Sequence, residues 1–188
     1  ALETAKLPGF DQTDLANTYL SLGKSYACTG NVKEAESYLT RALEIDERSP
    51  EHIIARATDY VELALLYFKT GRLAEAADYN QKAIDSLDKL ENPPVVLLAK
   101  ALKQLAIVTA EHLNFDLALV HADRAISALE NSGGQKQSLI YGEVLMVKTI
   151  ALVELGKLDE AKDLYARAIQ TIELNRGPFH PKVASILD

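Results

Sequence analysis

The residues that could perform chemistry are few and widely spaced. The chain of 188 residues has four histidines, His52, His112, His121 and His180, and one cysteine, Cys28. No two histidines are four residues apart, and no cysteine or carboxylate pattern joins them into a set typical of zinc sites. We therefore expect no metal site and no cofactor, and we interpret His180 as a residue at the start of a helix.

Other candidates for catalysis have simpler interpretations. A nucleophilic role for Cys28 would need a histidine nearby in space, and the spacing indicates none, so we expect a small, partly buried residue. Gly133-Gly134 lies in the segment NSGGQKQS, which is typical of a flexible link and not of a phosphate-binding loop. Carboxylates such as Glu34 and Glu75 are expected on solvated helix faces. The sequence therefore predicts that the chain is not an enzyme.

The composition narrows the class of protein. The chain is 48% apolar and 25% charged, as is typical of a soluble globular protein. Its net charge of −7 argues against a nucleic acid partner, because a phosphate backbone attracts basic surfaces. No apolar run approaches the roughly 18 residues of a membrane span. A single cysteine excludes an internal disulfide and fits a reducing compartment, so we expect a cytoplasmic protein that binds no membrane.

A triplet of small residues recurs along the chain. In each triplet the second residue follows the first by 12 positions, and the third follows by 7 more. The four triplets are Gly23-Ala35-Ala42, Ala64-Ala76-Ala83, Ala106-Ala118-Ala125 and Thr149-Ala161-Ala168. Successive triplets are offset by 41, 42 and 43 residues, a period that indicates stacked structural repeats. Small side chains let helix backbones approach closely, so we interpret these residues as contact points within and between helical hairpins.

Turn residues divide each repeat into two helices. Apolar positions recur at spacings of three and four, which predicts helices. Gly30, Gly71 and Gly156 lie seven residues after the first small position, where Leu113 stands in the third repeat. Each glycine fits the left-handed residue that ends a helix. We expect first helices to start at Ser49-Pro50, Asn92-Pro93 and His180-Pro181, where a capping residue precedes a proline at the first helical position.

This pattern resembles the tetratricopeptide repeat family. That family places an aromatic residue, Leu with Gly or Ala, and Tyr in its first helix, and small residues around an aromatic or Leu in its second. The first repeat here supplies Tyr19, Leu22, Gly23, Tyr26, Ala35, Leu39 and Ala42. The long period and the segment RGPFHPKVASIL resemble the kinesin-light-chain-like subgroup. The resemblance implies an all-α fold, a right-handed α-solenoid of helical hairpins.

The repeat pattern extends along the whole sequence as a single array. We expect four full repeats, at 11–47, 50–91, 93–131 and 136–175. Residues 1–7 fit the tail of a preceding repeat, and residues 180–188 fit the start of a fifth. Because the register continues to both ends and the chain does not begin with methionine, we expect a piece of a larger scaffold or adaptor protein. Further repeats or domains of the same full-length chain are then among its partners.

The resemblance also implies a concave groove, lined by the first helices, that binds a protein or peptide partner. The matching positions are Leu20, Lys24, Val61, Glu62, Leu65, Phe68, Lys69, Lys100, Lys103, Gln104, Ile107, Glu111, Met146 and Ile150. Leu65, Ile107 and Ile150 hold a position that is usually polar in the family, so we expect an apolar ladder. The alternative is that long first helices bury these residues as core. Lys148 stands where leucine is expected, so a fourth repeat rotated by one residue would also bury Ile150.

The expected charges of the groove cancel. They are Lys24, Lys69, Lys100 and Lys103 against Glu62, Glu111, Glu143 and Glu154. The basic clamp of chaperone-binding family members is not expected, because only Lys100 matches it. We predict binding of a protein or peptide by shape and apolar contacts, with charges setting orientation. One alternative is a regulatory segment of a signalling protein or transcription regulator, in which a peptide or small ligand changes the superhelix through the Gly133-Gly134 link. Another is an array that targets a fused catalytic domain.

Overall fold

The structure is a computed structural model that describes residues 12–133 and 138–176. These residues form eight α-helices and no strand: α1 (Gln12–Cys28), α2 (Val32–Glu47), α3 (Ile53–Lys69), α4 (Leu73–Leu87), α5 (Val95–Glu111), α6 (Phe115–Asn131), α7 (Leu139–Glu154) and α8 (Leu158–Arg176). The expected partial repeats at 1–7 and 180–188 lie outside the described residues, as do Gly134 and the predicted helix start at His180-Pro181.

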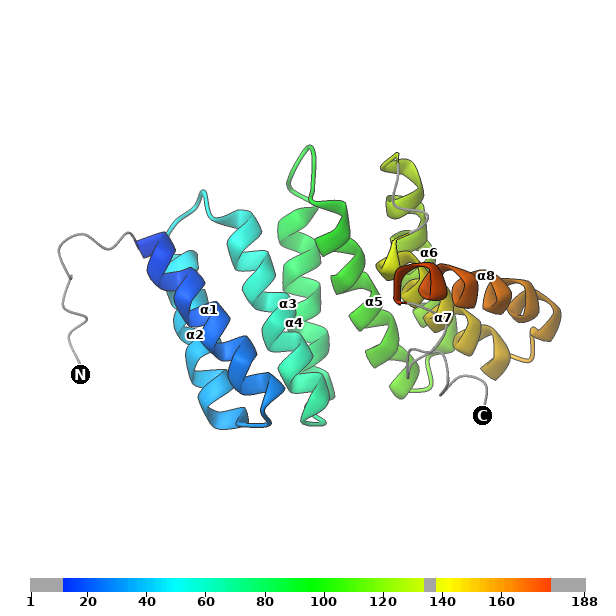
Figure 1. Cartoon of the computed structure of the whole chain (residues 1–188), viewed down its shortest axis with the longest axis horizontal. Coiled ribbons are helices and arrows are strands. Elements are labelled where there is room, and N and C mark those ends of the chain that lie inside the picture. The colour runs from blue at the N-terminus through cyan, green and yellow to red at the C-terminus, as the bar shows by residue number, and fades with distance from the viewer. Residues whose placement is uncertain (1–11, 134–137, 177–188) are drawn as a thin grey trace.

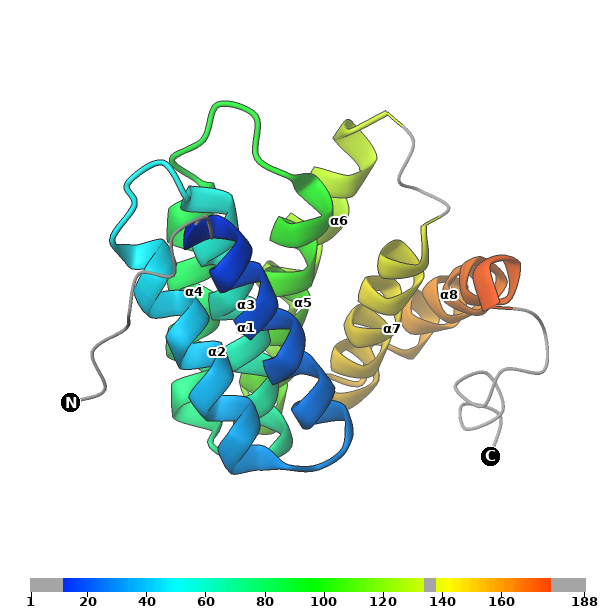
Figure 2. The same cartoon turned by 60° about the vertical axis from the view of Figure 1, so that its left-hand side comes forward.

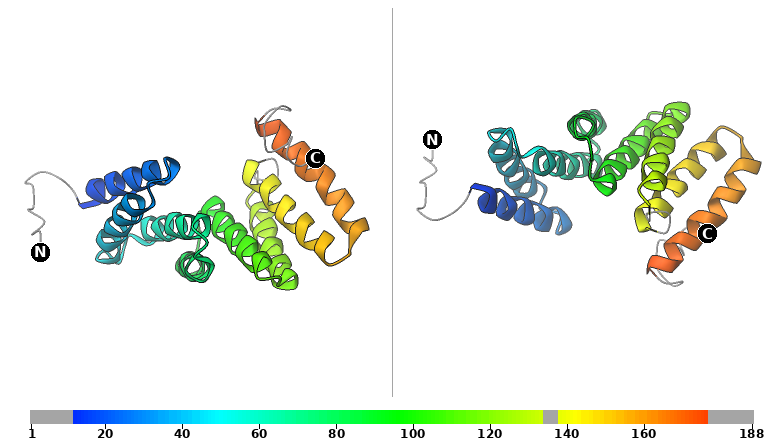
Figure 3. Two further views of the ribbon diagram at one scale, coloured as in Figure 1. Left: turned by 90° about the horizontal axis from the view of Figure 1, so that it is seen from below. Right: turned by 90° about the horizontal axis from the view of Figure 1, so that it is seen from above.

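Consecutive helices pair into four hairpins that follow one another along the long axis (Figure 1). The second helix of each hairpin packs on the first helix of the next, and neighbouring first helices also touch one another. Within the described residues the second helices do not touch one another. The first helices therefore line one side of the stack and the second helices the other, a succession that Figures 2 and 3 show from further directions. This confirms the expected all-α solenoid of helical hairpins.

The small-residue triplets lie at the helix contacts. Every member is buried, from Gly23 in α1 to Ala168 in α8. Gly23 shows why size matters, since a Cβ atom added there would lie 2.6 Å from Cγ of Leu39 in α2. Carbon atoms normally approach to about 3.5–4.0 Å, so even one methyl group would push the two helices apart. The prediction that these residues are contact points is confirmed.

Helix α7 keeps the register of the other first helices. Thr149 is buried at 5% exposure while Ile150 is 51% exposed. The alternative that this helix is rotated by one residue, with Ile150 in the core, is therefore wrong. Lys148 reaches back to α6, where its Nζ lies 2.6 Å from Oδ1 of Asp123. Lys148 thus occupies the position in α7 that the fully buried Leu63 occupies in α3.

A left-handed residue ends every first helix. The backbone φ angle is +79° at Gly30, +77° at Gly71, +58° at Leu113 and +74° at Gly156. In each turn the next residue donates its N–H to a carbonyl five residues back, as Asn114 does to Thr109 at 3.0 Å. This is the Schellman arrangement, which satisfies a free carbonyl at the helix end. The prediction for the glycines is confirmed, and Leu113 adopts the same conformation in spite of its side chain.

Two helices begin later than the proline pattern predicts. Helix α3 begins at Ile53, after Ser49-Pro50, and α5 begins at Val95, after Asn92-Pro93. The first proline lies inside a turn in which the N–H of His52 donates to the carbonyl of Ser49 at 3.0 Å. Proline is favoured in such a turn because its fixed φ fits the second position. The predicted helix starts at these two prolines were wrong, because both prolines lie in the loops that connect one hairpin to the next.

Candidate functional site

A groove of about 640 Å³ lies between the first helices α3, α5 and α7. Its lining residues are Val61, Glu62, Leu65 and Phe68 from α3; Val96, Lys100, Lys103, Gln104 and Ile107 from α5; Ser138, Leu139, Ile140 and Glu143 at the start of α7; and Arg176 at the end of α8. Spacings of three and four residues place each helix's contribution on one face of that helix. Half of the lining side chains are apolar, and they come from three different hairpins.

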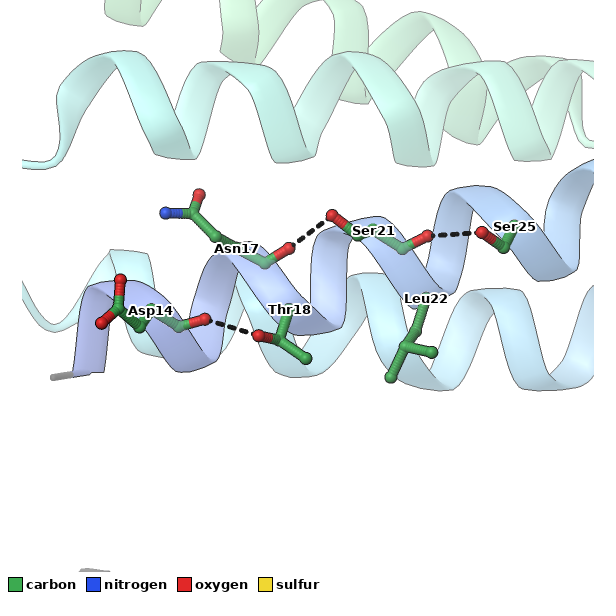
Figure 4. A pocket seen from close by; sticks show the side chains of 6 residues that line it. All are labelled: Asp14, Asn17, Thr18, Ser21, Leu22 and Ser25. Atoms are coloured by element: carbon green, nitrogen blue, oxygen red, sulfur yellow. Dashed lines mark hydrogen bonds between the residues drawn. The ribbon is translucent and has the colours of Figure 1, made fainter. Parts of the chain in front are cut away.

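A second hollow lies on an exposed face of α1, and Figure 4 shows the side chains that line it. The hydroxyl of Thr18 donates to the carbonyl of Asp14 at 2.8 Å, and that of Ser21 donates to the carbonyl of Asn17 at 2.8 Å. Ser25 bonds in the same way to Ser21. These hydroxyls are satisfied by their own helix, and a single helix forms the hollow. We therefore place the candidate site in the groove between α3, α5 and α7.

Eight of the fourteen candidate residues line the groove. They are Val61, Glu62, Leu65, Phe68, Lys100, Lys103, Gln104 and Ile107. Lys24 joins from α1 through an ion pair, with its Nζ 3.2 Å from Oε1 of Glu62. Val61 is 3% exposed and belongs to the hydrophobic core, so it offers a partner little surface although it lines the groove.

The remaining candidates lie elsewhere. Leu20 and Met146 are partly buried against the core. Lys69 is exposed and borders a small hollow beside α1, and Glu111 is exposed at the last residue of α5. Ile150 is 51% exposed but does not line the groove. The structure therefore separates these five residues from the groove.

Two members of the expected apolar ladder meet in the groove. Leu65 of α3 and Ile107 of α5 are both half-buried and both line it. They are neither core residues nor largely exposed. Ile150 does not continue the ladder, because α7 contributes its first residues to the groove, Leu139 and Ile140 among them. The apolar surface is therefore shared by the middle of α3, most of α5 and the start of α7.

The family positions did not include Val96, Ser138, Leu139, Ile140 or Arg176. The α7 residues were missed because motif positions place the middle of a first helix in the groove, whereas α7 presents its start. Arg176 belongs to a second helix. Helix α8 has 19 residues against 15 in α4, so its last turn extends to the groove. The length of the helical pattern after Leu158 was the one sequence signal for this residue.

Ion pairs border the groove on two sides. The carboxylate of Glu143 lies 2.6 Å from Nζ of Lys103 and 3.2 Å from Nη2 of Arg176. Lys100 is exposed, and no ion pair joins it to a described residue. Among the lining residues three cations face two carboxylates, so the lining carries a charge of +1 where the sequence predicted balance. The amide oxygen of Gln104 is buried without a hydrogen-bond donor from the described residues.

The chemistry of other described residues is limited. No group of His, Cys, Asp and Glu side chains among residues 12–133 and 138–176 has the arrangement of a metal site. Cys28 is exposed, so the expectation of a partly buried cysteine was wrong. In the part of the chain that the structure describes, every helix is too short or too polar to cross a membrane.

Comparison with known sequences identifies the repeats. Residues 14–89 match the sequence profile of the tetratricopeptide repeat family. These residues are tetratricopeptide repeats. The array is also similar to two Arabidopsis thaliana proteins, Protein KINESIN LIGHT CHAIN-RELATED 3 and Protein KINESIN LIGHT CHAIN-RELATED 2, at 28% and 25% identity. The alignments cover 99% and 95% of this chain but only 28% and 27% of those proteins. The resemblance to the family and to its kinesin-light-chain-like members is confirmed.

Solved structures of tetratricopeptide-like arrays share the fold. Aspartyl phosphate phosphatase F from Bacillus subtilis has a TM-score of 0.78 at 18% identity, covering 90% of this chain and 43% of that one. The apo form of RapI has a TM-score of 0.79 at 15% identity, covering 89% and 59%. BtubC from P. vanneervenii has a TM-score of 0.78 at 21% identity, covering 94% and 70%. At these identities the likeness shows the helical-repeat architecture alone.

Proposed function

We propose that this array binds a segment of a protein partner in the groove between α3, α5 and α7, without catalysing a reaction. The observation that supports this most strongly is the convergence of half-buried apolar side chains from three hairpins on one groove. A partner segment that covers Leu65 and Ile107 would bury these half-exposed side chains further. An apolar centre with a charged border is also the usual anatomy of a protein interface.

The dimensions suit a short peptide segment. The lining residues of α5 run from Val96 to Ile107. At 1.5 Å per residue this stretch is about 16 Å long. An extended chain advances about 3.3 Å per residue, so about five residues of a partner would contact the groove along α5. Apolar side chains of that segment would then lie against Leu65 and Phe68.

The charged residues would set the orientation of the segment. The ion pair of Lys24 with Glu62 lies on the α3 side, and Glu143 with its two cations lies on the α7 side. Lys100 projects from α5 between these sides and has no acidic partner among the described residues. Charges at the border of an interface mainly steer the encounter and fix the register, while buried apolar anchors supply most of the affinity.

The similarity to kinesin-light-chain-related proteins supports a scaffold or adaptor role, because it covers nearly the whole of this chain. This chain spans about a quarter of the length of those relatives. The alternative of a ligand-sensing regulatory segment has one structural support: Gly133, at the link between the third and fourth hairpins, has a φ of +72°. A change in the small-angle scattering curve of the protein when a ligand is added would favour that alternative.

The proposal is tested with peptides selected from a random displayed library on the unmodified protein. Binding of a selected peptide is then measured by calorimetry for Ile107→Lys and for the matched control Val120→Lys, which alters an apolar residue that is 60% exposed on α6. We expect Ile107→Lys to weaken binding by about 30-fold, the equivalent of about 2 kcal/mol for a buried hot spot. We expect the control to change binding less than twofold. Equal effects of both variants, or no selected peptide, would contradict the proposal.

A further inference from the structure

The contact between the first two hairpins differs chemically from the later ones. Asp46 of α2 and Asp59 of α3 are 3% and 0% exposed. The residues at the same register in the later contacts are apolar and buried: Leu87 with Ala101 between α4 and α5, and Leu129 with Val144 between α6 and α7. A pair of buried carboxyl groups therefore replaces an apolar contact at this one junction of the described array.

The surroundings of the two carboxyl groups are unequal. Oδ1 of Asp46 lies 2.8 Å from Nδ1 of His52, and its backbone carbonyl accepts a hydrogen bond from Nη1 of Arg56 at 3.4 Å. Both carboxyl oxygens of Asp59 are buried, and no donor of the described residues bonds to them. The acidic groups that face Asp59 are Asp46 across the contact and Glu62 along α3.

Protonation of Asp59 determines whether these two carboxyl groups bond to each other or repel each other. When Asp59 is protonated, its hydroxyl can donate to the carboxylate of Asp46, and the two groups then form a neutral acid bonded to a single negative charge. When Asp59 is ionised, two buried negative charges face each other across the helix contact. Burial, followed by the hydrogen bond that a protonated Asp59 donates to Asp46 and by the charges of Asp46 and Glu62, raises the pKa of Asp59 to about 8.

We propose that a shared proton between Asp59 and Asp46 holds the α1–α2 hairpin on the rest of the array, and that its loss loosens the α2–α3 contact. His52 and Arg56 also lie at this junction, together with Glu62, which Lys24 of α1 neutralises from the groove side. Two further carboxylates of α2 face α3: Glu47 accepts a hydrogen bond from Tyr60, and Glu36 accepts from Tyr67 and from Arg72. Loosening of the hairpin would withdraw Lys24 from Glu62 and open one side of the groove. This consequence rests on the proposed function, whereas the loosening does not.

The apolar junctions of the same array provide an internal reference. Amide hydrogen exchange, measured without any partner at pH 6 and pH 9, gives the ratio of the rates in α1–α2 to those in α5–α6 at each pH. Because both rates are taken at one pH, the intrinsic pH dependence of exchange cancels. We expect this ratio to rise by about 100-fold in the unmodified protein. Asp59 is ionised in an opened hairpin at any pH above about 4, so each pH unit between 6 and the closed-state pKa of about 8 favours opening by a factor of about ten, with little change above it.

The decisive comparison is with Asp59→Asn, which keeps the size of the side chain and can donate to Asp46 without titrating. We expect its ratio to stay within twofold between the two pH values. An equal rise in both proteins, or no rise in the unmodified one, would overturn the proposal. Titration of the Asp59 carboxyl carbon by NMR in the unmodified protein provides a second measurement that needs no variant. A midpoint near that of an ordinary aspartate, about 4, would also overturn it.

Discussion

Replacement of Leu113 by glycine should stabilise the array. Leu113 ends α5 with a φ of +58°, where the other three turns have glycine. A side chain with a Cβ atom is strained in this left-handed conformation because the Cβ atom approaches the following carbonyl oxygen. The side chain itself is 76% exposed, so its removal sacrifices little apolar contact. The Leu113→Gly substitution therefore isolates the backbone strain of one turn.

The magnitude follows from two opposing terms. Relief of the left-handed strain contributes about 1–2 kcal/mol. Glycine also loses more conformational freedom on folding, which costs about 0.5–1 kcal/mol. We expect a net gain of about 0.5–1 kcal/mol in the free energy of unfolding. For a chain of this size that corresponds to a rise in melting temperature of about 1–4 °C.

The assay is urea unfolding followed by circular dichroism, in which a stability change shifts the midpoint but leaves the slope unchanged. The matched control is the reverse change in the second hairpin, Gly71→Ala. A Cβ atom at Gly71 would meet no other atom within 4 Å, so only its φ of +77° opposes the substitution. We expect Gly71→Ala to lose stability of similar size, about 0.5–1 kcal/mol. A lower midpoint for Leu113→Gly, or an unchanged midpoint for both variants, would refute the reasoning.

Three further predictions concern packing and the groove. Ala83→Leu should cost about 1–3 kcal/mol, because Ala83 is fully buried, whereas Ala74→Leu on the exposed side of α4 should be neutral; equal urea midpoints would contradict the register. Gly23→Ala should destabilise by a similar amount, because its methyl group would clash with the buried Leu39, and an unchanged melting temperature would show that α1 can move away from α2. Ile107→Lys should lower stability by less than about 1 kcal/mol, because the half-buried position lets the ammonium group reach water; a large drop in melting temperature would place Ile107 in the core.

The periodic features of this fold could be predicted from the sequence because they depend on local rules. The small residue at Gly23 and its counterparts recur at fixed spacing, since each hairpin repeats the same close helix contact. Gly30 and its counterparts end the first helices because the left-handed turn favours glycine. The pattern left the conformation of Leu113 open, because there the hydrogen bonds of the turn override the preference of the side chain.

The groove could be predicted only in part. Leu65 and Ile107 were placed correctly on neighbouring first helices, because α3 and α5 keep the register of the motif. The third wall depends on how α7 crosses α5, which no local pattern encodes. The start of α7 faces the groove, so Leu139 and Glu143 line it while Ile150 does not. Arg176 enters from a second helix, and its approach to Glu143 depends on the length of α8.

The central claim is that the groove between α3, α5 and α7 is the binding surface. It is tested most directly by NMR of labelled Ile, Leu and Val methyl groups during titration with a selected peptide. We predict that the largest chemical-shift changes occur at Leu65, Ile107 and Leu139, which line the groove, while Val120 on α6 stays unchanged. The largest changes at methyl groups of α4, α6 or α8, with Leu65 and Ile107 unaffected, would contradict it.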